Sequence, residues 1–138
     1  MKGFEKQVAT FSQSITLHSL GVRHDPVCWW KSSAQNPHWK QKRWLSFEKE
    51  GYYRICFPAF TIKELGEIIP DTIKTAEGES DLMWYKKDGV FWCEYFIDGN
   101  ELKQLHATNE AILRGFVLIT LIKSGYYSVF SEEDNKIN

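Results

Sequence analysis

The chain has 138 residues, of which 43% are hydrophobic, 25% charged and 15% aromatic, and these values exclude intrinsic disorder for its body and fit one domain over residues 1–138. Its formal net charge of −1 hides an asymmetry, because residues 1–69 carry ten Lys and Arg against six Asp and Glu, whereas residues 70–138 carry seven against twelve. No apolar run approaches the roughly 18 residues of a membrane span, and the N-terminus lacks the apolar core of a signal peptide, so we expect a cytoplasmic protein with no membrane partner.

The first half of the chain predicts two short helices with three short strands between them. The first helix covers residues 10–20, with Ser12 as its cap and Gly21 at its end. Strands are expected at residues 27–30, 38–47 and 52–57, separated by polar turns. The second helix covers residues 61–69. Thr61 and Glu64 give it a capping-box signature, and Pro70 stops it.

The second half contains the clearest local signal, a hairpin of two aromatic strands at residues 82–87 and 90–97 joined by Asp88-Gly89. Residues 71–81, which precede it, read as a polar and acidic loop with a mobile tip at residues 77–80. The two-residue turn fixes a register that pairs Lys87 with Val90, Tyr85 with Trp92 and Met83 with Glu94. A last strand is expected at residues 102–106.

Residues 109–124 predict a helix that is apolar almost all round, and we expect it to be buried on every side. Thr108 is its expected cap, with Glu110 in the first turn and Lys123 and Gly125 at the end. Clustered strands without alternating βαβ units indicate an α+β fold. The prediction is a single antiparallel sheet of about five or six strands with about three helices on one side, the helix at 109–124 being buried against the sheet. Residues 131–138 are expected to fray.

The two faces of the hairpin differ. One carries apolar and aromatic residues suited to a core: Leu82, Trp84, Phe91, Cys93, Tyr95 and Ile97. The other carries Met83, Tyr85, Trp92 and Phe96, but it also has the charged Glu94 in mid-strand. We expect this second face to stay open as an interaction surface, because exposed aromatic residues on a flat sheet anchor protein contacts and symmetric dimers. The alternative is a covering layer from the N-terminal segment or from residues 126–130.

A second candidate surface is a stretch in which basic and aromatic residues interleave, suited to stacking on unpaired bases while cations follow the phosphates. Because side chains alternate along a strand, basic and aromatic residues fall on both of its faces and are not sorted onto one. This favours the alternative, a solvated strand with one Trp in the core, over nucleic-acid binding. The residues concerned are Trp39, Lys40, Lys42, Arg43, Trp44 and Arg54.

No catalytic, metal or cofactor motif is evident. His24 and Asp25, with Cys28 nearby, could form a base and nucleophile, but they lack the glycine-rich or strand-elbow context of such sites. The four histidines lack zinc-site spacing, and the glycines are scattered singly. Cys28, Cys56 and Cys93 are odd in number and lie in apolar runs, so we expect them to be reduced and buried. The expectation is a protein that is not an enzyme and has no cofactor.

Three landmarks carry a resemblance: Leu17-His18-Ser19-Leu20-Gly21-Val22 running to Trp29-Trp30, then residues 57–66 with Pro70, then Ala107-Thr108-Asn109-Glu110-Ala111 opening the last helix. Together they resemble small uncharacterised proteins of prophages and mobile elements in gut Bacteroidales, over residues 14–126. The resemblance implies a cytoplasmic accessory protein of a mobile element and carries no catalytic residue. The leading hypothesis is therefore a protein-interaction module that binds a protein partner or itself as a homodimer, and the alternative is a nucleic-acid-binding accessory protein.

Overall fold

A computed structural model describes residues 3–32, 43–49, 55–97 and 101–129 of the chain. The fold is α+β, as predicted, and over these residues it comprises one 3₁₀ helix, three α-helices and eight strands. In chain order the elements are η1 (Phe4–Gln7), α1 (Phe11–Ser19), β1 (Trp29–Ser32), β2 (Arg43–Ser46), β3 (Ile55–Pro58), α2 (Ile62–Ile68), β4 (Thr72–Thr75), β5 (Gly78–Asp81), β6 (Met83–Lys87), β7 (Val90–Ile97), β8 (Glu101–Ala107) and α3 (Glu110–Lys123).

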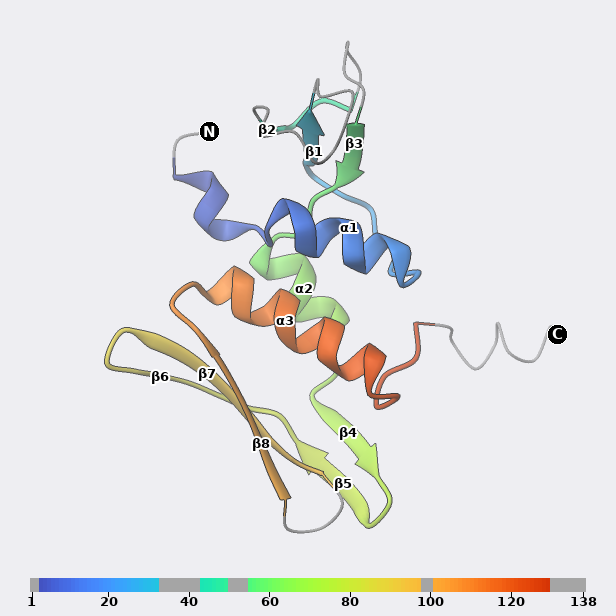
Figure 1. Cartoon of the computed structure of the whole chain (residues 1–138), viewed down its shortest axis with the longest axis vertical. Helices are drawn as coiled ribbons and strands as arrows, with labels where there is room; N and C mark the ends of the chain where they lie inside the picture. The colour runs from blue at the N-terminus through green and yellow to red at the C-terminus, as the bar shows by residue number, and fades with distance from the viewer. Residues whose placement is uncertain (1–2, 33–42, 50–54, 98–100, 130–138) are drawn as a thin grey trace, which may run out of the picture.

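The helices form a middle layer between two groups of strands. Figure 1 shows the β1 to β3 strands at one end of the molecule and the β4 to β8 strands at the other, with α1, α2 and α3 between them. Helix α3 contacts α1 and α2 on one side and strands β7 and β8 on the other. The last helix therefore joins the helical layer to the β6-β7-β8 sheet.

The strands form three small antiparallel sheets, so the prediction of a single sheet is wrong. Their orders are β2-β1-β3, β4-β5 and β6-β7-β8. The hairpin register is confirmed at all three predicted pairs, and β8 adds a third strand beside β7. The predicted loop at 71–81 is in fact the β4-β5 hairpin, with Ile73 and Ser80 pointing inward. Its other side chains are mostly exposed and polar, which gave it the composition of a loop.

Helix α3 begins one residue later than predicted. The Asn109 side chain, not that of Thr108, accepts the hydrogen bond from the Ile112 amide at 3.1 Å. Glu110 in the first turn and Lys123 in the last turn complement the helix dipole as expected. The prediction of burial on every side is wrong at Phe116, which is 43% exposed.

The caps of the other two helices show one error and one success. Helix α1 is capped by Thr10, which forms a capping box with Gln13, and not by Ser12. Helix α2 is capped by Thr61 as predicted, with its hydroxyl accepting from the Glu64 amide at 3.1 Å and the Glu64 carboxylate accepting from the Thr61 amide at 3.0 Å. Both boxes satisfy backbone donors that the first turn of a helix leaves open.

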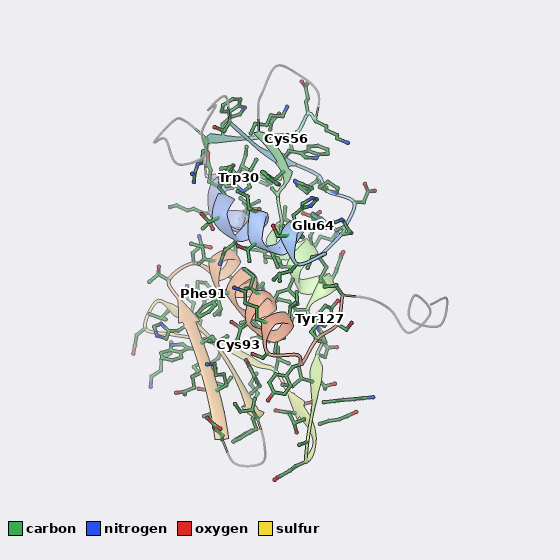
Figure 2. The ribbon with its side chains drawn as sticks, turned by 45° about the vertical axis from the view of Figure 1, so that its right-hand side comes forward. Trp30, Cys56, Glu64, Phe91, Cys93 and Tyr127 are labelled. Atoms are coloured by element: carbon green, nitrogen blue, oxygen red, sulfur yellow. The ribbon has the colours of Figure 1, made fainter. Side chains whose placement is uncertain are left out.

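The described residues pack into two clusters of buried side chains. The larger one joins α1, α2 and α3 to the inner faces of the β4-β5 and β6-β7-β8 sheets, and the smaller one lies beneath β1, around Val8, Cys28, Leu45 and Ala59. The three cysteines are free, and burial raises the pKa of Cys28 and Cys93 to about 12. Cys56 is only half-buried, against expectation. Figure 2 shows Cys56 and Trp30 in the β1 to β3 end and Phe91 and Cys93 in the other. The predicted frayed tail, 131–138, lies outside the described residues.

Candidate functional site

The β6-β7-β8 sheet has one face against α3 and one turned away from it, which we call the outer face. The inner face is core: Cys93, Tyr95 and Leu105 are buried there. The outer face is built in rows across the three strands. One row is Tyr85, Trp92 and His106, and the next is Met83, Glu94 and Gln104. Beyond these rows Phe96 pairs with Leu102, and at the opposite end Lys87 pairs with Val90.

Four large apolar side chains of the outer face are exposed to solvent. Met83 is 42%, Tyr85 40%, Phe96 43% and Leu102 40% exposed, while Trp92 is half-buried. Neither proposed covering layer lies there in the described part of the chain, because Tyr126, Tyr127 and Val129 pack against the main core. At the N-terminal end, Phe4 packs against the smaller cluster beneath β1. The face that alternation predicted to be open is therefore exposed.

Aromatic rings connect the three strands of the outer face. The Tyr85 and Trp92 rings are nearly parallel, at 4° with centroids 6.1 Å apart, and the His106 ring lies 4.6 Å from that of Trp92. Side chains directly opposite on neighbouring strands are close enough for such contacts, which hold the rings in place. Preordered side chains lose less conformational entropy on binding.

Glu94 lies at the centre of the outer face and is fixed by its neighbours. Its Oε1 accepts hydrogen bonds from the Tyr85 hydroxyl and from Gln104 Nε2, the latter at 2.7 Å. These bonds, first that from Tyr85 and then that from Gln104, hold the pKa of Glu94 below its ordinary value. The same bond raises the pKa of Tyr85. An ionised carboxylate therefore stands in the middle of an aromatic surface at neutral pH.

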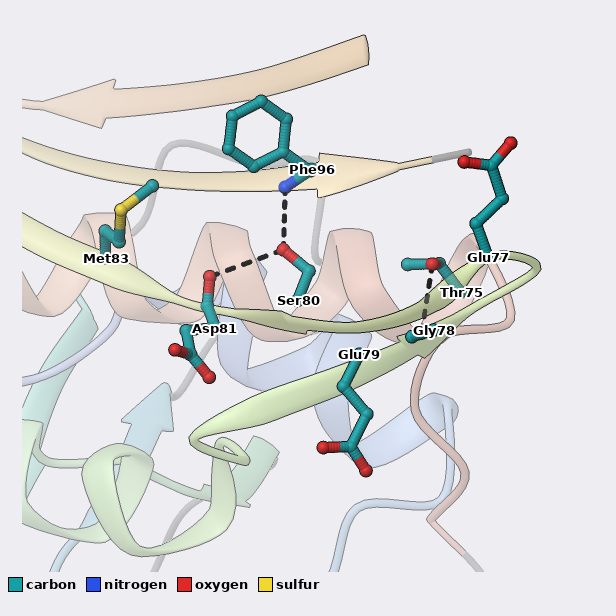
Figure 3. Close-up of a pocket in the computed structure, with 8 residues that line it drawn as sticks. All are labelled: Thr75, Glu77, Gly78, Glu79, Ser80, Asp81, Met83 and Phe96. Atoms are coloured by element: carbon teal, nitrogen blue, oxygen red, sulfur yellow. Dashed lines mark hydrogen bonds between the residues drawn. The ribbon is translucent and has the colours of Figure 1, made fainter. Parts of the chain in front are cut away.

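A hollow of about 360 Å³ adjoins the Phe96 end of this face, between β7 and the β4-β5 hairpin. Ser80 lines the hollow, and its hydroxyl accepts a hydrogen bond from the Phe96 amide at 2.8 Å, which ties β5 to β7. Three carboxylates of the β4-β5 hairpin line this hollow, and Figure 3 draws them with Met83 and Phe96. The residues that line the hollow are Thr75, Glu77, Gly78, Glu79, Ser80, Asp81, Met83 and Phe96.

Sequence reasoning found the hairpin residues of the outer face and missed those contributed by β8. Leu102, Gln104 and His106 face outward because β8 pairs with β7 from Phe91 through Ile97. The available signal was the alternation within residues 101–107, which sorts Leu102, Gln104 and His106 onto one face. It becomes interpretable only once the pairing with β7 is known.

The structure describes two of the six residues proposed for nucleic-acid binding. The Arg43 guanidinium lies 4.1 Å from the centroid of the Phe11 ring, so this cation faces helix α1. Trp44 pairs with Lys31 of β1 and alternates to the other face of the strand. A cation and a ring on opposite faces do not form one surface. Trp39, Lys40, Lys42 and Arg54 lie outside the described residues.

The candidate base and nucleophile are arranged structurally rather than as a reactive pair. His24 Nε2 lies 2.9 Å from the Ala59 carbonyl and 3.2 Å from Glu64 Oε2, and its ring stacks on that of Phe60 at 4.0 Å. Asp25 points elsewhere, into a hollow that it shares with His18 and Cys56. The Cys28 thiol is fully buried, and burial, followed by the nearby Glu64 charge, raises its pKa to about 12, which disfavours the thiolate that a nucleophile requires.

The buried His24 and Glu64 pair predicts a pH-dependent stability. Burial alone would raise the pKa of the Glu64 carboxyl, but the contacts with His24 and Thr61 outweigh it and hold the pKa below the ordinary 4.5. A depressed folded-state pKa stabilises the protein above the unfolded-state value, and this stabilisation is lost as pH falls through the folded-state value. We expect Glu64→Gln to lower the free energy of unfolding by about 1–3 kcal/mol at pH 7 and by less at pH 3.5.

Urea unfolding of both proteins at the two pH values measures this difference. Glu67→Gln is the matched control, because Glu67 is an exposed residue of the same helix. A difference between Glu64→Gln and wild type that is equal at both pH values would contradict the assignment.

Among the described residues no group of three or more His, Cys, Asp and Glu is placed to hold a metal ion. No helix in the same part of the chain is both long and apolar enough to cross a membrane. Comparison of the chain with protein-family models, with curated proteins and with solved structures finds no significant match. The resemblance to mobile-element proteins therefore stays a prediction.

Proposed function

We propose that the protein is a non-enzymatic interaction module that docks on a protein partner through the outer face of its β6-β7-β8 sheet. The observation that carries the proposal is the exposure of Met83, Tyr85, Phe96 and Leu102, each between 40% and 43%, around one fixed carboxylate. Aromatic and methionine side chains are enriched at the centres of protein interfaces. The half-buried Trp92 supplies the kind of anchor on which binding energy concentrates.

Exposed apolar side chains also occur singly elsewhere on the described surface. A second Phe with the same exposure, Phe116 at 43%, lies on α3 and not on the outer face. Exposure of a single apolar side chain is normal in a soluble protein and by itself needs no explanation. What distinguishes the outer face is that several such side chains are neighbours on one sheet.

The test is affinity purification of the tagged full-length chain from cells that express it, followed by identification of the bound proteins. An untagged second copy is expressed in the same cells, so that self-association is also detected. We expect Phe96→Arg to reduce recovery of the partner at least about tenfold, because a charge replaces an apolar contact at the interface. Phe96 is preferred to Trp92 because the Trp92 ring also contacts Tyr85 and His106, so its replacement would disturb the sheet.

Phe116→Arg is the matched control, and it is expected to retain the partner in full. Far-UV circular dichroism of both variants checks that folding is unchanged. Equal recovery of every bound protein by wild type, Phe96→Arg and Phe116→Arg would refute docking through this face.

A further inference from the structure

The two ends of the outer face carry opposite charges. Lys87 stands at the end next to the Asp88-Gly89 turn, on the same face as Tyr85 and Met83. At the opposite end, Met83 and Phe96 line a hollow together with Glu77, Glu79 and Asp81 of the β4-β5 hairpin (Figure 3). The exposed surface therefore has a direction, from a cation at the Asp88-Gly89 turn to the carboxylates of the β4-β5 hairpin.

The centre of the outer face is also directional. Trp92 and Glu94 occupy neighbouring rows of the middle strand β7, so a ring with an N–H donor lies beside a carboxylate. Both internal hydrogen bonds of Glu94 go to Oε1, and Oε2 is therefore the oxygen that can accept from a partner. A complementary surface would offer an apolar ring and a donor opposite Glu94, and a carboxylate opposite Trp92.

A second copy of the same face meets both requirements in one orientation only. In a face-to-face pair, the two-fold axis lies in the plane between the sheets and runs either along or across the strands. An axis along the strands keeps each row opposite itself and sets Glu94 opposite Glu94. An axis across the strands, between the two central rows, sets Trp92 opposite Glu94 of the second copy and turns the Lys87 end toward the Glu77 end.

We infer that the partner on the outer face is a second copy of this chain, packed face to face with its strands antiparallel across such an axis. This inference rests on the proposed function and specifies its partner. Sheets stack about 10 Å apart, which leaves room for one layer of side chains from each copy. In that layer the Trp92 indole donates to Glu94 of the second copy, and Tyr85 packs against the second copy's Met83.

The dimensions of the face set the expected strength of the dimer. Three strands about 4.8 Å apart and four rows about 6.8 Å apart give a flat patch of roughly 15 by 25 Å on each copy. Such a patch covers roughly 375 Å² on each copy, or about 750 Å² in total, which is less than the roughly 1,000 Å² of a stable specific interface and fits only a weak, reversible complex. The dimer should therefore dissociate on dilution.

Charge reversal tests the antiparallel arrangement by sedimentation equilibrium. At low salt we expect Lys87→Glu and Glu77→Lys each to raise the dimer dissociation constant about fivefold. The two-fold axis creates two Lys87–Glu77 pairs between the copies, each at roughly 10 Å, and either reversal makes both pairs repulsive. The variant with both substitutions should return to the wild-type value. The effects should disappear at about 1 M salt.

Charged residues away from the outer face supply matched controls. Lys86 precedes Lys87 and faces the other side of β6, with Nζ 4.9 Å from the Phe91 ring centroid, and Glu67 is an exposed carboxylate on helix α2. Lys86→Glu and Glu67→Lys are expected to leave the dissociation constant unchanged.

Two results would overturn the inference. If the two single reversals weaken the dimer and their combination does not restore it, the copies are not antiparallel. If wild type stays monomeric to about 100 μM while Phe96→Arg still loses a different protein in the recovery experiment, the face docks a different partner. In that second case the proposed function stands and only its specification fails.

Discussion

Phe60→Ala is expected to lower the free energy of unfolding by about 3–5 kcal/mol, the usual cost of deleting a fully buried aromatic ring. Phe60 has no exposed surface and belongs to the main core cluster. Its carbonyl also accepts a hydrogen bond from the Ala9 amide at 2.8 Å, which joins the segment before α2 to the segment before α1. The substitution keeps that backbone bond and removes only the ring.

The ring has a second role that adds to the cost. It stacks on the His24 imidazole, with planes 27° apart, and so covers the polar contact between His24 and Glu64. In the wild type the His24 and Glu64 side chains are only 8% and 12% exposed. Without the Phe60 ring, water can reach the contact between them. The pH dependence contributed by Glu64 should therefore shrink in Phe60→Ala, because solvent screens an exposed pair more strongly than a buried one.

Equilibrium unfolding in urea, followed by circular dichroism and by Trp fluorescence, measures the loss. Phe116→Ala is the matched control, since it deletes the same ring at a position 43% exposed, and its cost should stay within about 1 kcal/mol. Similar losses for both substitutions would show that the Phe60 ring is not the core element described. Phe60→Leu, which leaves a smaller cavity, should fall between the two.

Signals within a few residues predicted the local structure well. The Asp88-Gly89 turn gave the hairpin and its register, which follow from the turn type once the loop has two residues. Thr61 and Glu64 gave the start of α2 because both partners of the capping box lie within one turn. The two wrong caps, Ser12 and Thr108, each have the true cap one or two residues away, where Thr10 and Asn109 offer equivalent side-chain acceptors.

Features that depend on distant pairing could not be predicted in the same way. The division into three sheets is set by which strand edges meet, and the alternation of a strand does not specify its neighbour. The β4-β5 hairpin buries little besides Ile73 and Ser80, so it lacks the apolar alternation by which a strand is recognised. The same limit applied to the candidate site: the hairpin half of the outer face followed from local register, and the β8 half required a strand pairing.

Gly115 shows how a residue can interrupt a pattern for a reason visible only in three dimensions. In the sequence it is a break in the apolar run of the last helix. In the structure it is buried in α3 with helical backbone angles, so its conformation does not require glycine. A Cβ atom at Gly115 would lie 2.8 Å from Gln13 Oε1, which is closer than van der Waals contact allows. Glycine is there because α1 brings a side chain against the helix.

The Gln13 side chain joins the two helices at this point. Its Nε2 donates to the Ile112 carbonyl of α3 at 2.8 Å, and its Oε1 accepts from the Thr10 amide at the α1 cap at 3.1 Å. A larger residue at position 115 must displace Gln13 and break both bonds, or push the helices apart. The neighbouring α3 residues Val117 and Leu118 are fully buried and leave little room for the second response.

Gly115→Leu is therefore expected to lower the free energy of unfolding by about 3 kcal/mol or more, from overpacking and from the lost hydrogen bonds. Gly115→Ala should cost much less, because alanine gains about 1 kcal/mol in helix propensity and only the flexible end of Gln13 has to shift. Urea unfolding of Gly115→Leu in the wild-type and Gln13→Ala backgrounds identifies the obstacle. If Gln13 is the group displaced, the leucine costs less in Gln13→Ala, and an equal cost in both backgrounds would mean that the helix backbones themselves resist the larger side chain.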